Sequence, residues 1–368
     1  MPEISRNFSH MPQAELLSKL VLTLPALVTA ILAPIAGFFV DFSGRKRVMI
    51  YSLLLYSLAG TSGAYLNDLY LILAGRAFLG MAVGGIMTAG TTLIGDFFEG
   101  ESRSRFMGYQ AAFAGLGGLL FIVSGGVLAD ISWRMPFLIY ISALGVLLMV
   151  WRFIPEPPRI DHIKHEPQSK DGEPEKSLIR LIPSAVWLVY IIAFFSMAVF
   201  YMIPVQMPFF LSAMPGVSNT AVGVAIAFMN ITAVSMALNY GRIKRRMSFH
   251  HMLSLIYFFI FMGYLIISQA GSYTMMVAGI LVSGLGFGLQ MANLNLWLIT
   301  LAPAQMRGRL TGYLNSVIFL GMFLSPVLLQ PLVSGVGLSG SFLGVAIILI
   351  VLAFVFLCCA GARLKQAG

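Results

Sequence analysis

The sequence predicts an all-α membrane protein with two helix bundles, of five and six transmembrane helices. Two observations carry this expectation. The chain of 368 residues is 58% hydrophobic and only 10% charged, with a mean hydropathy of +0.88, whereas a soluble domain is roughly 45–50% apolar and about 25% charged. Its apolar residues also gather into stretches of about 20, the length that crosses a hydrocarbon core roughly 30 Å thick.

Eleven stretches are long and apolar enough to cross a bilayer. Each must be helical, because lipid offers no hydrogen-bond partner to backbone N–H and C=O groups. Five precede and six follow a charged, proline-rich segment whose composition is typical of a linker. The expected domains are an N-terminal bundle at 1–154, a cytoplasmic linker at 155–182 and a C-terminal bundle at 183–368. The expected spans are 16–40, 48–66, 69–95, 106–129, 134–154, 183–210, 218–240, 250–269, 273–301, 310–332 and 339–361.

The two bundles share a short sequence repeat. The segments "RFMGYQ" (105–110) and "RLTGYLN" (309–315) both contain Arg-x-x-Gly-Tyr, and both stand where a short loop enters a span. Parallel repeats of this kind are typical of membrane proteins with a substrate path between two halves. Chance similarity over so few residues is the alternative.

The distribution of cations predicts the orientation. Of the 23 Lys and Arg residues, 19 fall in the loops and tail expected on one side, three on the other, and Arg76 inside a span. By the positive-inside rule, the 41–47 loop, the linker and the C-terminus lie in the cytoplasm and the N-terminus lies outside. The net charge of +9 therefore serves topology in a plasma membrane, the inner membrane of a bacterium, and does not indicate nucleic-acid binding.

Catalytic and metal chemistry find little support in the sequence. Cys358 and Cys359 are neighbours and so make no disulfide framework. The histidines in the linker and at 250–251 lack the clustered partners of a zinc or acid–base site. The chain has no phosphate-binding P-loop. We expect neither an enzyme nor a bound cofactor or metal.

One loop carries a resemblance to a known family. The pattern Gly37-x-x-x-Asp41-x-x-Gly44-Arg45-Lys46 between two spans resembles the signature that the major facilitator superfamily carries between its second and third helices. The resemblance implies that this loop is a conformational latch on the cytoplasmic side. The latch would comprise Gly37, Asp41, Gly44, Arg45, Lys46 and Asp96. Its cations can pair with Asp96, Glu99 or Glu101 of the loop that follows the third span.

Further segments extend the resemblance over nearly the whole chain. Arg76-x-x-x-Gly80 is similar to the family's fourth-helix motif, "SWRMPF" (132–137) to the start of its sixth helix, and "RGR" (307–309) to the loop before its eleventh. Counted from the signature loop, the first span of this chain corresponds to the family's second helix. The resemblance thus implies that the family's first helix is missing. A truncated reading frame is the favoured explanation, and a natural eleven-span variant is the alternative.

The fifth helix of the family bears on the direction of transport. Antiporters of the family carry a glycine- and proline-rich motif there, and this chain keeps its glycines but has Phe121 and Ile122 in place of the central Gly-Pro. An antiporter similar to bacterial drug–proton exchangers is therefore expected, with plain helix packing as the alternative role of the glycines. The expected helix-packing residues are Gly80, Gly108, Gly117, Gly125 and Gly126.

Polar residues inside the spans are candidates for a substrate or proton pathway. Gln290, Asn293 and Trp297 share one helical face, and Arg76 is the clear ion within a span, with snorkelling to the headgroups as its alternative role. Any single Asn could merely join two helices. The full candidate set is Arg76, Tyr201, Gln206, Asn230, Gln290, Asn293, Trp297 and Asn315.

The resemblance implies a secondary active transporter that moves a small amphipathic molecule by alternating access, with proton-coupled efflux as the expected mode. An uptake symporter or uniporter of the same fold is one alternative. A non-transporting sensor or degenerate paralogue is the other. The expected partners are a small-molecule substrate, protons and the lipid bilayer, and a monomer is expected.

Overall fold

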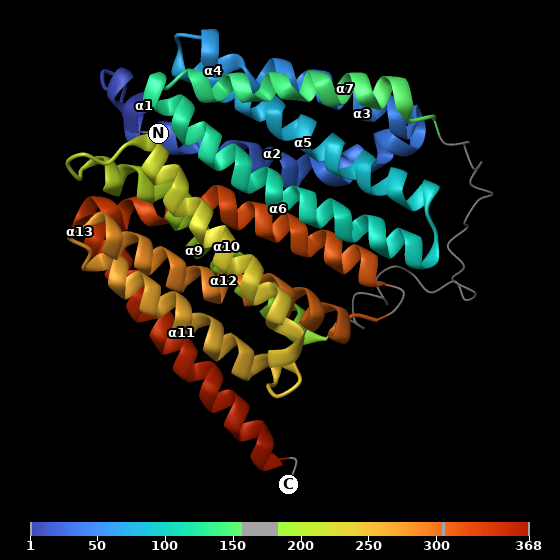
Figure 1. The fold of residues 1–368 in the computed structure, drawn as a ribbon. Helices are drawn as coiled ribbons and strands as arrows, with labels where there is room; N and C mark the ends of the chain where they lie inside the picture. The colour runs from blue at the N-terminus through green and yellow to red at the C-terminus, as the bar shows by residue number, and fades with distance from the viewer. Residues whose placement is uncertain (1, 157–182, 304–305, 367–368) are drawn as a thin grey trace.

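The computed structural model describes residues 2–156, 183–303 and 306–366, and in these ranges it contains helices and no strands. Side chains within them are described except at 33–34, 36–39, 41, 104, 108, 111–112, 308 and 361–366. The two halves of the chain lie side by side, with the blue-to-green helices on one side of the molecule and the yellow-to-red helices on the other (Figure 1).

The N-terminal half contains the first five predicted spans. In place of the loop predicted at 96–105, one long helix begins at Gly100. The sixth-helix segment opens with a 3₁₀ helix, and Pro136 stands in its first turn, where the missing N–H of proline costs no hydrogen bond. The elements of this half are α1 (Pro2–Asn7), α2 (Ala14–Ser43), α3 (Arg45–Gly60), α4 (Ser62–Tyr65), α5 (Leu69–Phe97), α6 (Gly100–Ile131), η1 (Met135–Ile141) and α7 (Ser142–Phe153).

The C-terminal half holds the remaining spans. The sequence predicts two separate helices after residue 309, but the structure joins them into one element of 60 residues that is interrupted at Gly337. Gly337 adopts φ 72°, a conformation that glycine reaches without strain, and the chain turns back there (Figure 1). The elements are α9 (Ser184–Ser212), α10 (Asn219–Lys244), α11 (Phe249–Ser268), α12 (Tyr273–Leu301) and α13 (Arg307–Gln366).

The predicted fold class is confirmed. In the described residues, 10 segments are long and apolar enough to cross a membrane, and the last of them covers 52 residues on both sides of the Gly337 break. Because a span needs about 20 residues, this last segment supplies two membrane-length legs. The count then agrees with the eleven predicted spans.

Short polar residues start the helices where the sequence allows. Asp68 accepts a hydrogen bond from the backbone N–H of Leu71 at 2.9 Å and so caps α5, and serines cap the starts of α10, α11 and α12 in the same way. Such a cap satisfies a backbone donor that the helix leaves free, and each contributes about 1 kcal/mol.

Two ends of the bundle can be distinguished. The basic end carries the Gly44 turn, the α5–α6 loop, Ile154 and the turn after Lys244, and it is the end expected in the cytoplasm. The opposite end carries α1 and the segments at 66–68, 132–134, 213–218 and 269–272.

Packing differs between the halves. The C-terminal half has one large continuous core drawn from all its helices, whereas the N-terminal half has two smaller clusters, one at each end. Helix α6 contacts α10 of the other half far more than it contacts α5, and most of its side chains are exposed. A space is thereby left between α6 and the other helices of its own half.

Candidate functional site

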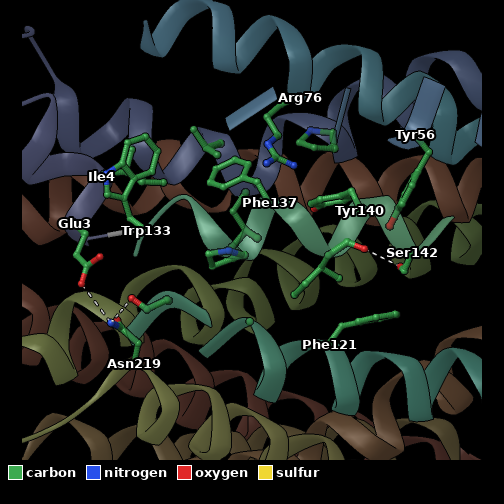
Figure 2. A pocket seen from close by; sticks show the side chains of 17 residues that line it. Glu3, Ile4, Tyr56, Arg76, Phe121, Trp133, Phe137, Tyr140, Ser142 and Asn219 are labelled. Atoms are coloured by element: carbon green, nitrogen blue, oxygen red, sulfur yellow. Dashed lines mark hydrogen bonds between the residues drawn. The ribbon is translucent and has the colours of Figure 1, made fainter. Parts of the chain in front are cut away.

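A pocket of about 330 Å³ occupies this space. It lies between α2, α3, α5, α6 and η1, and Asn219 at the start of α10 borders it from the other half (Figure 2). Most of its lining is apolar or aromatic, with single polar groups contributed by Glu3, Tyr56, Arg76, Ser142 and Asn219. Small-molecule sites have this character, because apolar walls supply binding energy and a few polar groups fix orientation.

Arg76 is the cation of this pocket. Its side chain is buried, with 4% of the residue exposed, and its guanidinium lies 4.5 Å from the ring centroid of Phe137 and 5.1 Å from that of Tyr140. Its Nη2 donates to the carbonyl oxygen of Gly60 at 3.4 Å. No described carboxylate lies within 4 Å of it, and its Nε has no hydrogen-bond partner. The side chain thus lies inside the protein rather than on its surface, which argues against snorkelling to the headgroups.

Glycines place the two rings beneath Arg76. A Cβ atom at Gly60 would overlap the ring of Tyr140, and one at Gly63 would overlap the ring of Phe137. The end of α3 and the short helix α4 therefore have to lack side chains at these positions for the rings of η1 to pack against them. The ring pair and the guanidinium lie close together in Figure 2.

Helix α5, which carries Arg76, is held tightly against α2. A Cβ atom at Gly80 would overlap the carbonyl oxygen of Pro25, and Thr29 donates its hydroxyl to the carbonyl oxygen of Gly80 at 2.8 Å. Of the predicted helix-packing residues, Gly80 thus makes a close helix contact. It stands one turn from Arg76 and fixes the position of that side chain.

A second arginine near the pocket, Arg134, differs from Arg76 in that its donors have partners within the protein. Arg134 stacks on Trp133 at 4.3 Å, but its Nη1 donates to backbone carbonyls, including that of Leu66 at 2.8 Å, and its Nη2 donates to Asn67 Oδ1 at 2.6 Å. Its donors close the α4–α5 turn. Arg134 is thus a structural arginine, and its hydrogen-bonding capacity is used within the protein.

At the basic end the structure brings part of the predicted latch together. Arg45 Nε lies 2.9 Å from Asp96 Oδ2, and both side chains are mostly buried. Gly44 forms the turn between α2 and α3 with φ 98°, a conformation that favours glycine. Gly37 and the Asp41 side chain lie outside the described side chains.

Lys46 has partners that the sequence did not reveal. Its backbone N–H donates to Glu156 Oε1 at 3.3 Å, and its Nζ donates to the carbonyl oxygen of Trp151 at 2.9 Å. These contacts tie the start of α3 to the end of α7. The nearest signal in the sequence was the position of Glu156 at the start of the linker, which does not identify a partner by itself.

The predicted face of α12 exists but turns inward. Gln290, Asn293 and Trp297 are all buried in the core of the C-terminal half, where Tyr240 donates its hydroxyl to Asn293 Oδ1 at 3.2 Å and Trp297 stacks on Phe249 with ring centroids 5.7 Å apart. None of the three borders the Arg76 pocket. Helical spacing identified the shared face, but it could not say which way the face points.

The other predicted pathway residues are dispersed. Gln206 is fully buried and both polar atoms of its side chain lack partners. At a rise of about 1.5 Å per helical residue, Gln206 lies roughly 9 Å from the end of α9 at the opposite end of the bundle. Gln290 lies roughly 16 Å from the end of α12 at the basic end, so the two side chains stand at different heights in the bundle. Tyr201 is half-buried, Asn230 donates to the Ile226 carbonyl of its own helix, and Asn315 is exposed. The structure does not assemble these residues into one site.

Of the predicted helix-packing glycines of α6, one makes a close helix contact and two do not. A Cβ atom at Gly126 would lie 2.7 Å from the carbonyl oxygen of Asn219, so α6 and α10 are in close contact there. At Gly117 and Gly125 the nearest side-chain atoms stand at 3.9 Å, so the close packing predicted for these two is not seen, because α6 has few neighbours in its own half. The surroundings of Gly108 lie outside the described side chains.

Polar contacts between the halves were missed by sequence reasoning. Asp130 of α6 accepts hydrogen bonds from the backbone N–H groups of Asn219 (2.6 Å) and Thr220 (3.0 Å) and from the Thr220 hydroxyl (2.5 Å). Lys19 of α2 is completely buried and donates to Gln330 of α13 at 2.9 Å. A lysine near a span end looks like a topology signal, and nothing in the sequence pairs it with residue 330.

Comparison with known proteins shows the family. The profile of the Major Facilitator Superfamily matches residues 1–326. The chain belongs to the major facilitator superfamily. Members of this superfamily are membrane transporters rather than enzymes, and the expectations drawn from the signature loop about family and fold are confirmed.

Two bacterial superfamily members are similar in sequence. The quinolone resistance protein NorA of Staphylococcus aureus is 28% identical over 167 residues, which are 45% of this chain and 41% of NorA, so the match spans less than two thirds of that relative. The bacillibactin exporter of Bacillus subtilis is 23% identical over 331 residues, which are 86% of this chain and 80% of the exporter.

Solved superfamily structures show the same fold. A bacterial homologue of the human lysosomal transporter Spinster aligns with a TM-score of 0.74 at 14% identity, over 95% of this chain and 89% of that one. A D-xylose–proton symporter aligns with a TM-score of 0.73 at 14% identity, over 93% and 87%. The human organic anion transporter MFSD10 gives 0.65 at 17%, over 93% and 84%.

Proposed function

We propose that this protein is a secondary active transporter that exports a small amphipathic molecule in exchange for protons. Superfamily membership supports transport. Export is supported by the two relatives, since one is named an exporter and the other a quinolone resistance protein. The location in a bacterial plasma membrane, with the basic end in the cytoplasm, belongs to the same proposal.

The observation that carries the proposal is how the halves meet at the opposite end. Asp130 caps α10 across the interface, and Lys19 reaches Gln330. Alternating access requires two bundles whose contacts can form and break between states of similar energy. Hydrogen bonds contribute only about 0.5–1.5 kcal/mol each, or about 1.5–3 kcal/mol when one partner is charged. A few such bonds can close one end without making closure permanent.

The latch at the basic end complements this closure. The Arg45–Asp96 pair joins the start of α3 to the end of α5, and Lys46 joins α3 to the segment that follows α7. The latch therefore braces the N-terminal bundle as one rigid unit at the basic end. We propose that Gly37, Asp41, Gly44, Arg45, Lys46 and Asp96 act together in this way.

The Arg76 pocket is the proposed substrate site. It combines apolar walls with a few polar groups, and it lies next to the α6–α10 contact, where the halves would move apart. Tyr201, Gln206, Asn230, Gln290, Asn293, Trp297 and Asn315 are the proposed pathway residues of the C-terminal half. The three buried amides with unpaired atoms, Gln206, Gln290 and Asn293, are the ones best suited to exchange partners during the cycle.

The test is transport in proteoliposomes with an imposed pH gradient. A panel of fluorescent amphipathic compounds, including a fluoroquinolone, should move in the direction opposite to that of the protons. A protonophore should abolish this movement. Flux that ignores the gradient favours a uniporter, and flux in the direction of the protons favours an uptake symporter. No flux for any compound favours a non-transporting paralogue. The variant Asp41→Asn should slow transport while leaving expression and folding unchanged.

A further inference from the structure

Among the residues that the structure describes, the buried Lys and Arg side chains are paired with carboxylates, with one exception. Of the Lys and Arg residues that are at least nine-tenths buried in the described chain, Lys19 lies 2.5 Å from Glu15 and Arg45 lies 2.9 Å from Asp96. Arg76 has no described carboxylate within 4 Å. Because a buried charge without a counter-charge is costly, the unpaired cation needs an explanation.

The two aromatic rings compensate Arg76 only in part. A cation over the faces of Phe137 and Tyr140 is attracted to them, but ring faces accept no strong hydrogen bond. A guanidinium has five N–H donors, and the structure shows Nη2 bonded to the Gly60 carbonyl at 3.4 Å while Nε has no partner. Donors therefore remain for a ligand in the pocket that Arg76 lines.

The surroundings hold the guanidinium in place. Helix α5 is packed against α2 at Gly80, and the rings below Arg76 pack against the end of α3 and against α4, where Gly60 and Gly63 leave room for them. The guanidinium points toward these rings in Figure 2. A fixed, preorganised fork of donors is suited to a planar carboxylate or a phosphate, which it can bind through two oxygens.

The remaining wall sets the character of the rest of the ligand. Pro25, Phe121, Trp133 and Pro136 line the pocket with apolar and aromatic surface. The one acidic residue among its lining, Glu3, accepts a hydrogen bond from Asn219 at 3.3 Å and lies at the other side of the pocket from Arg76 (Figure 2). A cationic ligand would therefore either place its charge beside that of Arg76 or have to displace Asn219 from the Glu3 carboxylate.

We infer that the Arg76 pocket binds an organic anion, with the carboxylate or phosphate group against the guanidinium and an apolar, aromatic body against the opposite wall. The inference rests on the proposed transport function, for which it names the substrate class. Arg76 is then the residue that selects charge, and the aromatic lining selects shape. The same chemistry would also fit the phosphate of an anionic lipid headgroup.

The test compares three ligands with the same body and different charge. Purified protein in nanodiscs of zwitterionic lipid is titrated with 2-naphthoate, 2-naphthalenemethanol and 2-naphthylmethylamine. The naphthoate should bind at least about tenfold more tightly than the alcohol. The carboxylate accepts hydrogen bonds from Arg76 as an ion pair, whereas the alcohol offers the guanidinium only a neutral acceptor. The amine should bind more weakly still. Equal or tighter binding of the amine would overturn the inference.

Variants assign the charge preference to one side chain. Arg76→Gln should lose most of the tenfold preference for naphthoate, and Arg76→Lys should retain part of it, because the charge stays but the fork is lost. Arg134→Lys is the matched control, since Arg134 also stacks on an aromatic ring but spends its donors on carbonyl and amide oxygens. Unchanged naphthoate affinity in folded Arg76→Gln overturns the inference, and Arg76→Lys gives the same answer if the Gln variant does not fold.

Two further measurements distinguish a lipid headgroup from a soluble anion, and the anion inference from the proposed transport function. In nanodiscs with phosphatidylglycerol, reduced naphthoate affinity that Arg76→Gln abolishes identifies a lipid headgroup as a competing occupant. Undiminished affinity identifies a soluble anion. Binding is measured without a gradient, so it does not depend on coupling. If vesicles transport cations with unchanged rates in Arg76→Gln, the transport function stands and the anion inference fails.

Discussion

At the scale of residues, the protein distinguishes cations by what satisfies them. Arg134 donates to carbonyl and amide oxygens, and Arg45 is paired with Asp96. Arg76 is buried with a free Nε. The first two stabilise the fold, because removing either would take away hydrogen bonds or an ion pair that join two segments of the chain. The third is available to a ligand. Burial and partners, rather than the identity of the residue, are thus the grounds on which Arg76 is proposed as the ligand-binding arginine.

The pair between Arg45 and Asp96 gives the first prediction. Asp96→Asn should lower stability by about 2 kcal/mol, less than for a fully buried pair, because both groups keep some contact with water. The midpoint of thermal unfolding in detergent measures this effect. The double variant Arg45→Asp with Asp96→Arg restores opposite charges and should recover part of the loss. If both variants unfold at the wild-type temperature, the pair does not hold the latch together.

At the scale of elements, glycines decide where helices meet. Gly80 allows α5 to touch the backbone of α2, and Gly126 allows α6 to touch that of α10. Gly90, on the same helix as Gly80, has only a methionine methyl group at an ordinary 3.4 Å from its would-be Cβ. The same residue type thus fills two roles on one helix, and only the structure separates them.

These glycines make a matched pair for measurement. Gly80→Ala should destabilise the protein by about 1–3 kcal/mol, because the Pro25 carbonyl has to move to admit the methyl group. Gly90→Ala should be neutral or stabilising by up to about 1 kcal/mol, because alanine is the better helix former. Thermal unfolding of both purified variants decides the matter. Equal stabilities would show that α2 and α5 adjust freely to each other.

The contact between α6 and α10 predicts a conformational effect. Asp130→Asn removes the charge from the cap that Asp130 places on α10, and so should favour separation of the halves at the opposite end. Spin labels on the two halves, in a variant with Cys358 and Cys359 replaced by serine, should show a larger population of long distances. Thr220→Val is the control, since it removes only the hydroxyl bond and should shift the population less.

At the scale of the whole molecule, the sequence predicted most of the fold and less of the site. Apolar stretches report burial in lipid directly, so the spans, the two bundles and the family were within reach. The facing of α12 was not, because Gln290, Asn293 and Trp297 would share a face whether it lines a cavity or a core. The contact of Lys19 with Gln330 joins residues 311 positions apart, and no local pattern encodes such a pair.

That contact gives the last prediction. Gln330→Leu removes the acceptor that α13 offers to Lys19 but leaves Glu15 in place. A hydrogen bond to a charged group contributes about 1.5–3 kcal/mol, so the population open at the opposite end should rise by roughly tenfold or more. A cysteine at Ser18, which is completely buried beside Lys19, in the Cys358 and Cys359 to serine background, labelled by a membrane-impermeant maleimide, reports this opening as faster modification. Ser334→Ala on the same helix, whose hydroxyl bonds only to its own helix at 2.9 Å, should leave the labelling rate unchanged. Equal rates in all three proteins would show that the Lys19 contact fills space without controlling the opposite end.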